Sequence, residues 1–575
     1  MRRPFALVAA YIVLISTVAF AQTPPVQTRP GMAPPPASQT PQRDKPGAVP
    51  GAKTGTAGIK GRILADTNTA IRRARVSLLT SNPLDSHMTT TDLDGRYEFT
   101  ELPAGQYRVT ASKGIFVPLE YGQQKPFDRG KPVDLADGQV VEKIDITLPR
   151  GGVVSGTLLD DVGDAAAGVR MTAMRQQFSD GKRRLVSIGH PVETNDVGQY
   201  RLYGLPSGTY FIGAMPSAAN PLIPMLTTPS GAPTYYPGTL NEMEAQRVTV
   251  RPGQDKILSD FTLVPARLVK ISGTATNAAG APVQMVMLMA TAQVSSGNAM
   301  PGMNTATVRP DGTFQLSNVP PGEYAIMAMS MNIGTGEQEI TAQPLTVAGE
   351  DITDFVLSTT KGFRATGQIL FDQPPPPATL LPSSLTLMAA PATQFSISGG
   401  MARGTIHDDW TFEVKGLAGP RQFQVAQGLP AGWMVQSVFY GQTDITDKPL
   451  EVKEDIDGVV ITLTKRPARI SGGVVDDSGK PVTEYSVVIF PDDTALGPPA
   501  STRYLRALRP GEGGKFSAER LPAAAYLVVA IPSLESGDEN DPELLEQLRP
   551  LATRAILSWG DAKELSLKLE KFDRR

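Results

Sequence analysis

The sequence lacks cysteine altogether and contains only three histidines and three tryptophans. Without cysteine there are no disulfide bonds and no thiolate nucleophiles or ligands, so stability must come from packed hydrophobic cores. A precursor anchored through a lipid-modified cysteine is excluded for the same reason. Lys+Arg 54 and Asp+Glu 57 nearly balance, with a net charge of −3. This balance leaves no basic surface for nucleic acid or for an anionic membrane.

Signatures of common enzyme classes are also missing. No Gly-x-Ser-x-Gly elbow, His-Glu-x-x-His pair, Walker loop or dinucleotide-binding glycine motif occurs. His190 and Glu193 fit the His-x-x-Glu spacing of zinc carboxypeptidases. Catalytic zinc needs a third ligand, an open position and a general base, and the remaining histidines, His87 and His407, lie far away in the chain. We therefore predict a protein that is not an enzyme and that holds no cofactor.

The N-terminus resembles an export signal. Arg2 and Arg3 precede an apolar run from Phe5 to Phe20, and small residues occupy the positions that a signal peptidase reads, before and at Ala21. Residues 1–21 are thus predicted to be a signal peptide cleaved after Ala21, with an uncleaved anchor as the alternative. No later segment reaches the length of a membrane span. The mature chain is expected in the periplasm or outside the cell, without a membrane span.

The chain is rich in turn-forming residues, with Gly 55 and Pro 51. Residues 22–56 hold many prolines and almost no large apolar side chains. Such a stretch cannot bury a core, so a disordered, extended linker is predicted there. Beyond it, the glycines and prolines are spread evenly, which is typical of many short strands joined by tight turns.

One sequence pattern recurs along the chain at intervals of about 100 to 115 residues, the size of a domain. It reads DGRYEFTELPAGQYRVTA from Asp94, VGQYRLYGLPSGTYFIGA from Val197 and DGTFQLSNVPPGEYAIMA from Asp311, with looser copies from Asp409 and Gly514. We assign the closing aromatic residue of the copies to Tyr107, Tyr210, Tyr324, Phe423 and Tyr526. A second motif opens each copy, with a glycine at Gly61, Gly156, Gly273, Gly367 and Gly472.

Within each copy, apolar residues two apart, such as Tyr97 and Phe99, place one face of a strand toward a core. Asp-Gly and Leu-Pro-x-Gly provide the intervening turns. The fold class is therefore all-β, with about five tandem immunoglobulin-like or transthyretin-like β-sandwiches. We predict sandwiches over residues 57–149, 150–265, 266–360, 361–466 and 467–572, called modules 1 to 5 below. A helix is expected only in an insertion near Asp541 to Leu551 of module 5.

The motif Asp-Gly-x-(Tyr/Phe)-x-(Phe/Leu), followed by Leu-Pro-x-Gly-x-Tyr, resembles the carboxypeptidase regulatory-like domain. This is a transthyretin-like sandwich, grouped with carbohydrate-binding-like folds and related to the B-type repeats of collagen adhesins. The resemblance spans residues 57–572 and is weaker where Leu417 to Pro420 replace Leu-Pro-x-Gly and where Ala524 replaces the glycine. It implies an accessory domain and not a peptidase, and fold alone does not fix function.

Ligand binding is predicted at exposed aromatic rings, on which sugars can stack. The candidates are Tyr235 and Tyr236 in the proline-rich insertion from 216 to 238, and Trp410 and Trp433 in module 4. Long insertions in compact domains are often functional. The alternative is that the tyrosine pair packs the insertion onto its own sandwich.

Module 3 has two methionine-rich segments, in which every second residue is methionine. They are Met285, Met287 and Met289, and then Met327, Met329 and Met331. Each trio shares one face of a strand, and two such faces could meet. Thioethers are soft ligands suited to Cu(I), whereas the alternative is that methionine fills an irregular core.

The predicted function is that of an exported, non-catalytic binding or scaffold protein with carbohydrate or a cell-envelope polymer as its ligand. A protein–protein adhesion or spacer protein, bound to another envelope protein, is the alternative. A metal-handling or metallopeptidase-related protein is the alternative of a different class.

Overall fold

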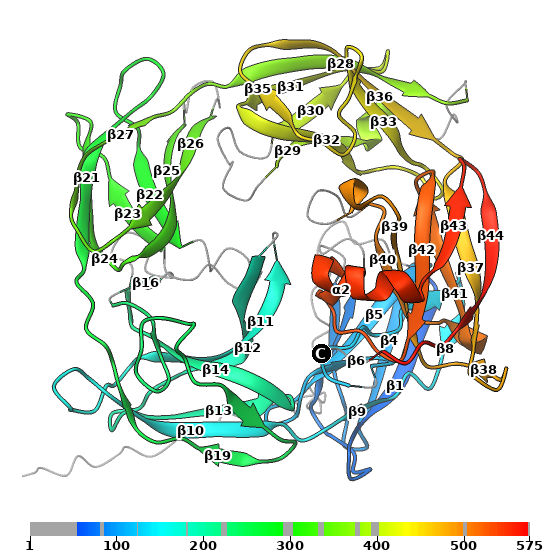
Figure 1. Cartoon of the computed structure of the whole chain (residues 1–575), viewed down its shortest axis with the longest axis horizontal. Coiled ribbons are helices and arrows are strands. Elements are labelled where there is room, and N and C mark those ends of the chain that lie inside the picture. Colours follow the sequence, from blue (N-terminus) through cyan, green and yellow to red (C-terminus); the bar gives the residue numbers. More distant parts are fainter. Residues whose placement is uncertain are drawn as a thin grey trace, which may run out of the picture. The chain divides into compact units, whose positions relative to one another are not determined.

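The computed structural model describes residues 55–80, 86–123, 125–179, 182–219, 227–229, 231–290, 303–331, 338–373, 380–392, 402–497 and 503–572. The predicted signal peptide, residues 22–54 of the predicted linker and part of the 216–238 insertion lie outside these ranges. Within them the regular secondary structure is β-strand apart from short 3-10 turns and one α-helix, α2 (Pro542–Leu548) (Figure 1). The predicted all-β fold class is confirmed.

Modules 1 and 2 hold the first twenty strands. Module 1 contains β1 (Ala57–Ala65), β2 (Arg75–Leu79), β3 (His87–Thr90), β4 (Arg96–Leu102), β5 (Gly105–Ser112), β6 (Leu119–Glu120), β7 (Val133–Leu135), β8 (Val140–Val141) and β9 (Ile146–Leu148). Module 2 contains β10 (Gly152–Leu159), β11 (Arg170–Ser179), β12 (Lys182–Glu193), β13 (Gln199–Leu205), β14 (Gly208–Met215), β15 (Ser217–Ala219), β16 (Thr227–Pro229), β17 (Thr234–Tyr235), β18 (Val248–Val250), β19 (Asp255–Ile257) and β20 (Phe261–Thr262).

Modules 3 and 4 follow without a spacer. Module 3 contains β21 (Val269–Thr276), β22 (Met285–Ala290), β23 (Met303–Thr307), β24 (Thr313–Val319), β25 (Gly322–Met331), β26 (Gln338–Val347) and β27 (Ile352–Ser358). Module 4 contains β28 (Phe363–Phe371), β29 (Thr386–Pro391), β30 (Ala402–Ile406), β31 (Thr411–Leu417), β32 (Gly419–Gln427), β33 (Met434–Tyr440), β34 (Thr443–Asp444), β35 (Leu450–Val452) and β36 (Ile456–Thr464), with the 3-10 turn η2 (Pro382–Ser384).

Module 5 contains the one α-helix among the described residues, α2. Its strands are β37 (Ala468–Val475), β38 (Pro481–Val482), β39 (Ser486–Pro491), β40 (Arg506–Leu508), β41 (Lys515–Leu521), β42 (Ala524–Ile531), β43 (Thr553–Leu557) and β44 (Ala562–Lys568). Its 3-10 turns are η3 (Thr494–Leu496), η4 (Glu512–Gly514), η5 (Asp538–Asn540) and η6 (Arg549–Leu551). Asp541 caps α2 by accepting from the Glu543 N–H, so the predicted helix in 541–551 is confirmed.

All five modules share one strand order. The first sheet begins β4-β1 in module 1 and recurs as β13-β10, β24-β21, β31-β28 and β41-β37, each with a parallel closing strand on the other side. The second sheet reads β3-β2-β5-β6, and then β12-β11-β14-β17, β23-β22-β25-β26, β30-β29-β32-β35 and β40-β39-β42-β43. In module 4 the pairing of β30 with β31 joins both sheets into one nine-stranded sheet. The repeated sequence pattern therefore encodes a repeated sandwich.

Each module has its own hydrophobic core between the two sheets. The largest clusters draw on residues 57–148, 154–261, 269–357, 365–463 and 468–567, and each lies inside one of the predicted module ranges. In β4, Tyr97 and Phe99 are buried while their neighbours are exposed, as the alternation predicted. Module 5 has a second core, in which Leu544, Leu545 and Leu548 of α2 cover the outer face of β39 and β42.

In four of the five modules the opening glycine stands against the backbone of the segment that pairs in parallel with the first strand, whereas a Cβ on Gly156 of module 2 would meet the Tyr200 hydroxyl at 2.8 Å. A Cβ added to Gly273 would lie 1.8 Å from the backbone oxygen of Phe355, and one added to Gly472 would lie 1.9 Å from that of Leu565. Gly61 and Gly367 stand against backbone oxygens in the same way. Because a backbone carbonyl cannot move without breaking the sheet pairing, only glycine fits at this position in the four modules.

A buried tyrosine anchors the turn between the two sheets in four modules. The hydroxyl groups donate to the backbone oxygen of the proline four residues earlier, at 2.6 to 2.8 Å: Tyr107 to Pro103, Tyr210 to Pro206, Tyr324 to Pro320 and Tyr526 to Pro522. Burial raises the pKa values of Tyr210, Tyr324 and Tyr526 well above the ordinary value of a tyrosine. Their hydroxyls therefore stay protonated and remain hydrogen-bond donors.

In module 4 an arginine replaces this tyrosine, which corrects the assignment of Phe423. Arg421 pairs with Leu450 as Tyr107 pairs with Val133, and its side chain is fully buried. Its Nε donates to Ala418 O at 3.1 Å and its Nη1 to Ala389 O at 3.3 Å. The turn from Leu417 is one residue shorter than Leu-Pro-x-Gly, so Phe423 lies two positions beyond the anchor. The guanidinium takes over the role of the tyrosine hydroxyl.

We expect Arg421→Gln to destabilise module 4 by about 2 kcal/mol, because a shorter amide leaves buried backbone oxygens without their donor. Hydrogen exchange of the β32 amides measures the change. Arg403→Gln, on β30, is the matched control and should leave exchange unchanged. Equal exchange in the two variants would contradict the anchoring role of Arg421.

Candidate functional site

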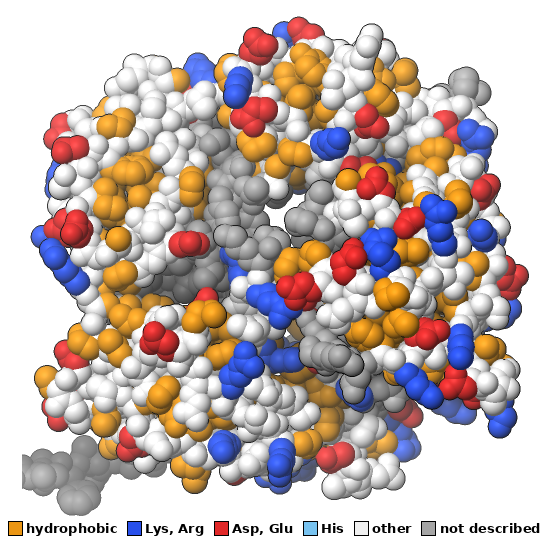
Figure 2. Space-filling view, viewed as in Figure 1, with side chains coloured by type: hydrophobic (Ala, Val, Ile, Leu, Met, Phe, Trp, Pro, Cys, Tyr) orange, Lys and Arg blue, Asp and Glu red, His pale blue; other side chains and the backbone are white. Residues whose placement is uncertain are grey.

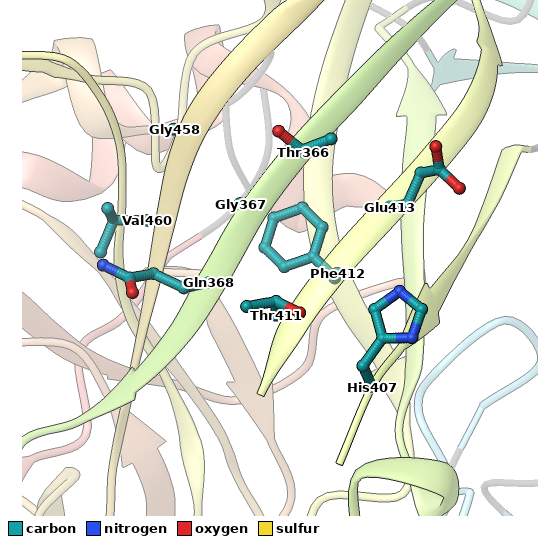
Figure 3. A pocket seen from close by; sticks show the side chains of 9 residues that line it. All are labelled: Thr366, Gly367, Gln368, His407, Thr411, Phe412, Glu413, Gly458 and Val460. Carbon is teal, nitrogen blue, oxygen red and sulfur yellow. The ribbon is translucent and has the colours of Figure 1, made fainter. Parts of the chain in front are cut away.

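A hollow of about 510 Å³ lies on the outer face of the first sheet of module 4 (Figure 3). Three neighbouring strands supply its lining: Thr366, Gly367 and Gln368 from β28, Thr411, Phe412 and Glu413 from β31, Gly458 and Val460 from β36, and His407 from the turn before β31. Their outward side chains follow from the register, in which Thr366 pairs with Glu413 and Gln368 with Thr411 and Val460. The hollow is thus a polar depression on a sheet surface.

The charges around this hollow are already paired. Glu413 forms ion pairs with Lys415 at 3.0 Å and with Arg364 at 3.8 Å, and Thr366 donates to Asp457 at 2.6 Å. Groups that are satisfied in this way have little capacity left for proton transfer. No cluster of three or more His, Asp or Glu side chains suited to a metal ion occurs among the described residues. The hollow can hold a small polar group, and its geometry does not suggest chemistry.

A larger groove, of about 1630 Å³, lies where module 5 meets module 1. Arg509 crosses it: its Nη2 donates to Glu484 at 2.7 Å and to the backbone oxygen of Gly122 at 3.4 Å. Lys131 of module 1 also pairs with Glu484, at 2.6 Å. The Nε and Nη1 atoms of Arg509 are buried and have no hydrogen-bond partner among the described residues, and burial raises the pKa of Glu120 in the same groove. The groove is a charged junction between the first and last modules.

The insertion of module 5, which in the structure is the segment 532–552 between β42 and β43, contacts modules 1 and 2 through ion pairs. Glu535 pairs with Arg175 of β11 at 3.0 Å, and Glu543 pairs with Arg183 of β12 at 2.6 Å. Glu539 pairs with Arg129 of module 1. Elsewhere charges of both signs alternate, and Figure 2 shows them interspersed over the face in view. The acidic insertion is therefore a specific contact element, because its partners are basic residues of two other modules.

Modules 4 and 5 are also joined by side-chain contacts. Tyr504 donates to Asp447 at 2.9 Å, and Arg503 donates to the backbone oxygen of Val435 at 2.9 Å while pairing with Asp447 at 3.6 Å. At the junction of modules 1 and 2, the Gly151 N–H donates to the backbone oxygen of Ile115 at 3.0 Å. Sequence patterns inside one module gave no indication of these contacts.

The structure places the predicted tyrosine pair against its own module. Tyr235 belongs to β17, which pairs with β14, and burial raises its pKa to about 12. Tyr236 is buried, with its ring edge-on to Phe261 at 5.6 Å between centroids. The described part of the insertion thus packs onto its sandwich, as the alternative interpretation predicted. Tyr236 presents no open ring face, and sugar binding by the pair remains an untested prediction.

The two tryptophan candidates flank one phenylalanine. Trp410 and Trp433 each stand edge-on to Phe371, at 4.8 and 5.8 Å, and Trp433 is only 4% exposed. The prediction that Trp433 offers a stacking surface is not supported, because its ring completes the core of module 4. Trp410 has a φ of 65° at the hairpin position where Gly312 has 83°, so it does replace the turn glycine. It is half-buried.

Other candidate residues lie in ordinary surface positions. His190 and Glu193 are exposed at the end of β12. The turn carboxylates accept hydrogen bonds from their own turns, as Asp311 does from the N–H and hydroxyl of Thr313. These bonds lower the pKa of Asp311. The acidic residues are therefore turn-forming groups, and they are not preorganised for a cation.

The methionine trios lie on adjacent strands of one sheet, which corrects the expectation that two separate faces meet. Met285 is opposite Met329 and Met287 is opposite Met327 in the pairing of β22 with β25. The residues between them, such as Val286, point into the core of module 3. Met331 is exposed at the end of β25. All of these methionines thus belong to the outer surface of the second sheet.

Comparison with known proteins agrees with the expected resemblance. Residues 58–149 match the model of the carboxypeptidase regulatory-like domain, which confirms the resemblance for module 1. The other modules repeat its strand order. No curated protein matches this chain. Among the described residues, no helix has the length and apolar character needed to cross a membrane.

Several solved structures are similar to parts of the chain. The Bacillus anthracis TIE protein is 17% identical over 54% of this chain and 51% of its own length, with a TM-score of 0.15. A streptococcal ancillary pilin is 13% identical over 53% of this chain and 98% of its own, with a TM-score of 0.21. The RrgB pilus protein from Streptococcus pneumoniae is 9% identical over 74% of this chain and 99% of its own, with a TM-score of 0.14. At such TM-scores these likenesses carry no argument about function.

Proposed function

We propose that this chain is an exported, non-catalytic scaffold or adhesion protein that binds another protein of the cell envelope. The supporting observation is that contacts join modules far apart in sequence: the module 5 insertion pairs with Arg175 and Arg183 of module 2 and with Arg129 of module 1. Modules linked in this way hold their outer surfaces at a fixed spacing, which suits recognition of an extended protein partner. Export rests on the predicted signal peptide.

Carbohydrate binding, the first prediction from the sequence, has weaker support. Sugar-binding sites on sandwiches stack ligands on exposed rings, whereas Tyr236 and Trp433 are buried and Trp410 packs against Phe371. The polar hollow at Thr366 has no exposed aromatic ring in its lining, since Phe412 is 2% exposed. Protein binding is therefore the function that the geometry favours.

Binding of the immobilised secreted chain to solubilised envelope material tests this function. One portion of the material is treated with protease, a second with glycan-degrading enzymes, and a third is left untreated. We expect saturable binding that protease abolishes and that glycan removal and soluble sugars leave unchanged. Binding that survives protease and is lost with the glycans would instead establish the carbohydrate interpretation, and absence of saturable binding would contradict both.

Charge reversal tests the contact between modules 2 and 5. Arg175→Glu should weaken this contact by about 1 kcal/mol, because it replaces a partly exposed attraction to Glu535 with repulsion. Hydrogen exchange of the amides around Ser536 should become faster, and Arg175→Glu combined with Glu535→Arg should restore slow exchange. Arg96→Glu, which removes an exposed pair within module 1, is the control. Unchanged exchange in Arg175→Glu would show that the pair does not hold the insertion.

A further inference from the structure

The outer face of the second sheet of module 3 carries a patch of thioethers, here called the methionine face and defined as Met285, Met287, Met289, Met327 and Met329. Cross-strand pairing aligns them: Met285 is opposite Met329, Met287 is opposite Met327, and Met289 is opposite Ala325. Side chains two residues apart on one strand share a face, so the two direct pairs are also adjacent to each other. Four sulfur atoms therefore come from one small area of the sheet.

The methionine positions are close enough for several of their sulfur atoms to contact one ion. Directly opposite residues have Cβ atoms about 5 Å apart, and diagonal neighbours are about 7 Å apart. Methionine has three rotatable side-chain bonds, so thioethers at both separations can reach a common point. A set of three sulfurs from Met287, Met327 and one of their neighbours is thus available without any change of the backbone.

The methionine face is partly shielded from solvent although it lies outside the main core, with Met327 buried and Met285, Met287, Met289 and Met329 half-buried. Met327 is 7% exposed, and Ile340 and Ala342 of β26 are 8% and 9% exposed. Met287, Met289 and Met329 pack against these three residues in a separate small cluster. On the next strand, Ala342 is opposite Met327 and Ile340 is opposite Met329. The groups beside the sulfurs on that side are hydrocarbon, whereas on the other side β23 places Thr305 opposite Met287 and Thr307 opposite Met285.

Modules 1 and 5 have different chemistry at the corresponding positions, whereas module 2 has two methionines there, Met174 and Met215, and module 4 has one, Met388. In module 1, β2 and β5 present Arg75, Ser77, Leu79, Arg108, Thr110 and Ser112. In module 5 the same face is aliphatic and is covered by the leucines of α2. The shared fold does not require sulfur at this place, because two other modules build the sheet without it. The concentration of methionine is a property of module 3.

We propose that the methionine face binds one Cu(I) ion through thioether sulfurs. Thioethers are neutral, soft donors that favour Cu(I) over Zn²⁺, Ca²⁺ or Mg²⁺, which prefer nitrogen or oxygen ligands. A monovalent ion also incurs a smaller desolvation cost in a partly shielded site than a divalent ion does. This inference goes beyond the scaffold function and does not depend on it.

Anaerobic titration of the full secreted chain with Cu(I), in competition with a coloured Cu(I) chelator, tests the site. We expect one bound Cu(I) per chain, and X-ray absorption should show a first shell of sulfur only. Met287→Leu with Met327→Leu preserves side-chain volume and should lower the Cu(I) affinity by about 100-fold or more, since even loss of supporting residues around a metal costs about 10- to 100-fold. Met285→Leu with Met329→Leu should also lower the affinity.

Met88→Leu with Met243→Leu is the matched control, because both residues are exposed methionines of other modules. It should keep the wild-type Cu(I) affinity. Circular dichroism of every variant checks that the fold is retained. Absence of Cu(I) binding by the wild type, unchanged affinity in both methionine-face variants, or an oxygen or nitrogen first shell would each overturn the proposal.

Discussion

Gly472→Ala is expected to destabilise module 5 by about 3 kcal/mol or more, because overpacking against a fixed backbone is among the most damaging single changes. The added Cβ would stand 1.9 Å from the backbone oxygen of Leu565. That oxygen belongs to β44, which pairs with β37 in parallel over seven residues, from Arg469 to Val475. The two strands cannot separate locally without loss of this pairing, so the whole first sheet of the module is affected.

The neighbouring Gly473 provides the matched control for this prediction. An added Cβ there meets nothing within 4 Å, so Gly473→Ala should leave stability unchanged or raise it slightly. Hydrogen exchange of the β44 amides is the suitable measurement, since a chain of several domains does not unfold in two states. Fast exchange is expected in Gly472→Ala only. Equal protection in both variants would contradict the steric role of the opening glycine.

Tyr526→Ala should destabilise module 5 by about 4 kcal/mol, the range found when a large buried ring is removed from a core. Tyr526 is fully buried beside Tyr504, and its hydroxyl donates to the backbone oxygen of Pro522 at 2.8 Å. Tyr526→Phe keeps the ring and removes only this hydrogen bond, so it should cost about 1 kcal/mol. The difference between the variants separates packing from hydrogen bonding.

The same exchange experiment, applied to the amides of β42 and β43, measures both tyrosine variants. The turn before β42 should open first, because the hydrogen bond to Pro522 holds it. If Tyr526→Ala were no less stable than Tyr526→Phe, the buried ring would contribute nothing to the core of module 5. That result would contradict the anchoring role of the repeated tyrosine. Loss of protection confined to modules other than 5 would contradict it equally.

Much of the fold could be predicted because its determinants are local. Alternation around Tyr97 and Phe99 identifies a half-buried strand within a few residues, and Leu-Pro-x-Gly identifies a turn. The spacing of Tyr107, Tyr210 and Tyr324 then gives the size of a module. Each of these signals depends only on residues close in sequence, and the structure confirms the sandwiches that they indicate.

Long-range substitutions were not predictable in the same way. Arg421 replaces the anchoring tyrosine because a shortened turn moves the guanidinium next to the backbone oxygen of Ala418. The repeat pattern therefore assigned the anchor position to the nearby aromatic residue Phe423, which lies two residues beyond Arg421. Burial of Trp433 likewise depends on Phe371, which lies more than sixty residues earlier in the chain. Neither effect has a local pattern in the sequence.

The candidate sites also combine features that local sequence determines with features that depend on distant residues. Period-two spacing correctly indicated that each methionine trio shares a face, but the pairing of β22 with β25 decides that both trios lie on the same sheet. Glu535 and Glu543 pair with Arg175 of β11 and Arg183 of β12, and no local sequence pattern indicated these partners. Partners of this kind are set by the way separate modules meet.

In the proposed scaffold the modules keep a fixed spacing, and a distance measurement between modules 2 and 5 tests this spacing most directly. The chain has no cysteine, so Val162→Cys with Ile556→Cys, both at exposed positions, allows two spin labels to be attached cleanly. Pulsed electron paramagnetic resonance should give one narrow distance distribution, which broadens in Arg175→Glu. A broad distribution in the unaltered background would show that the modules move independently, and it would contradict the proposed scaffold.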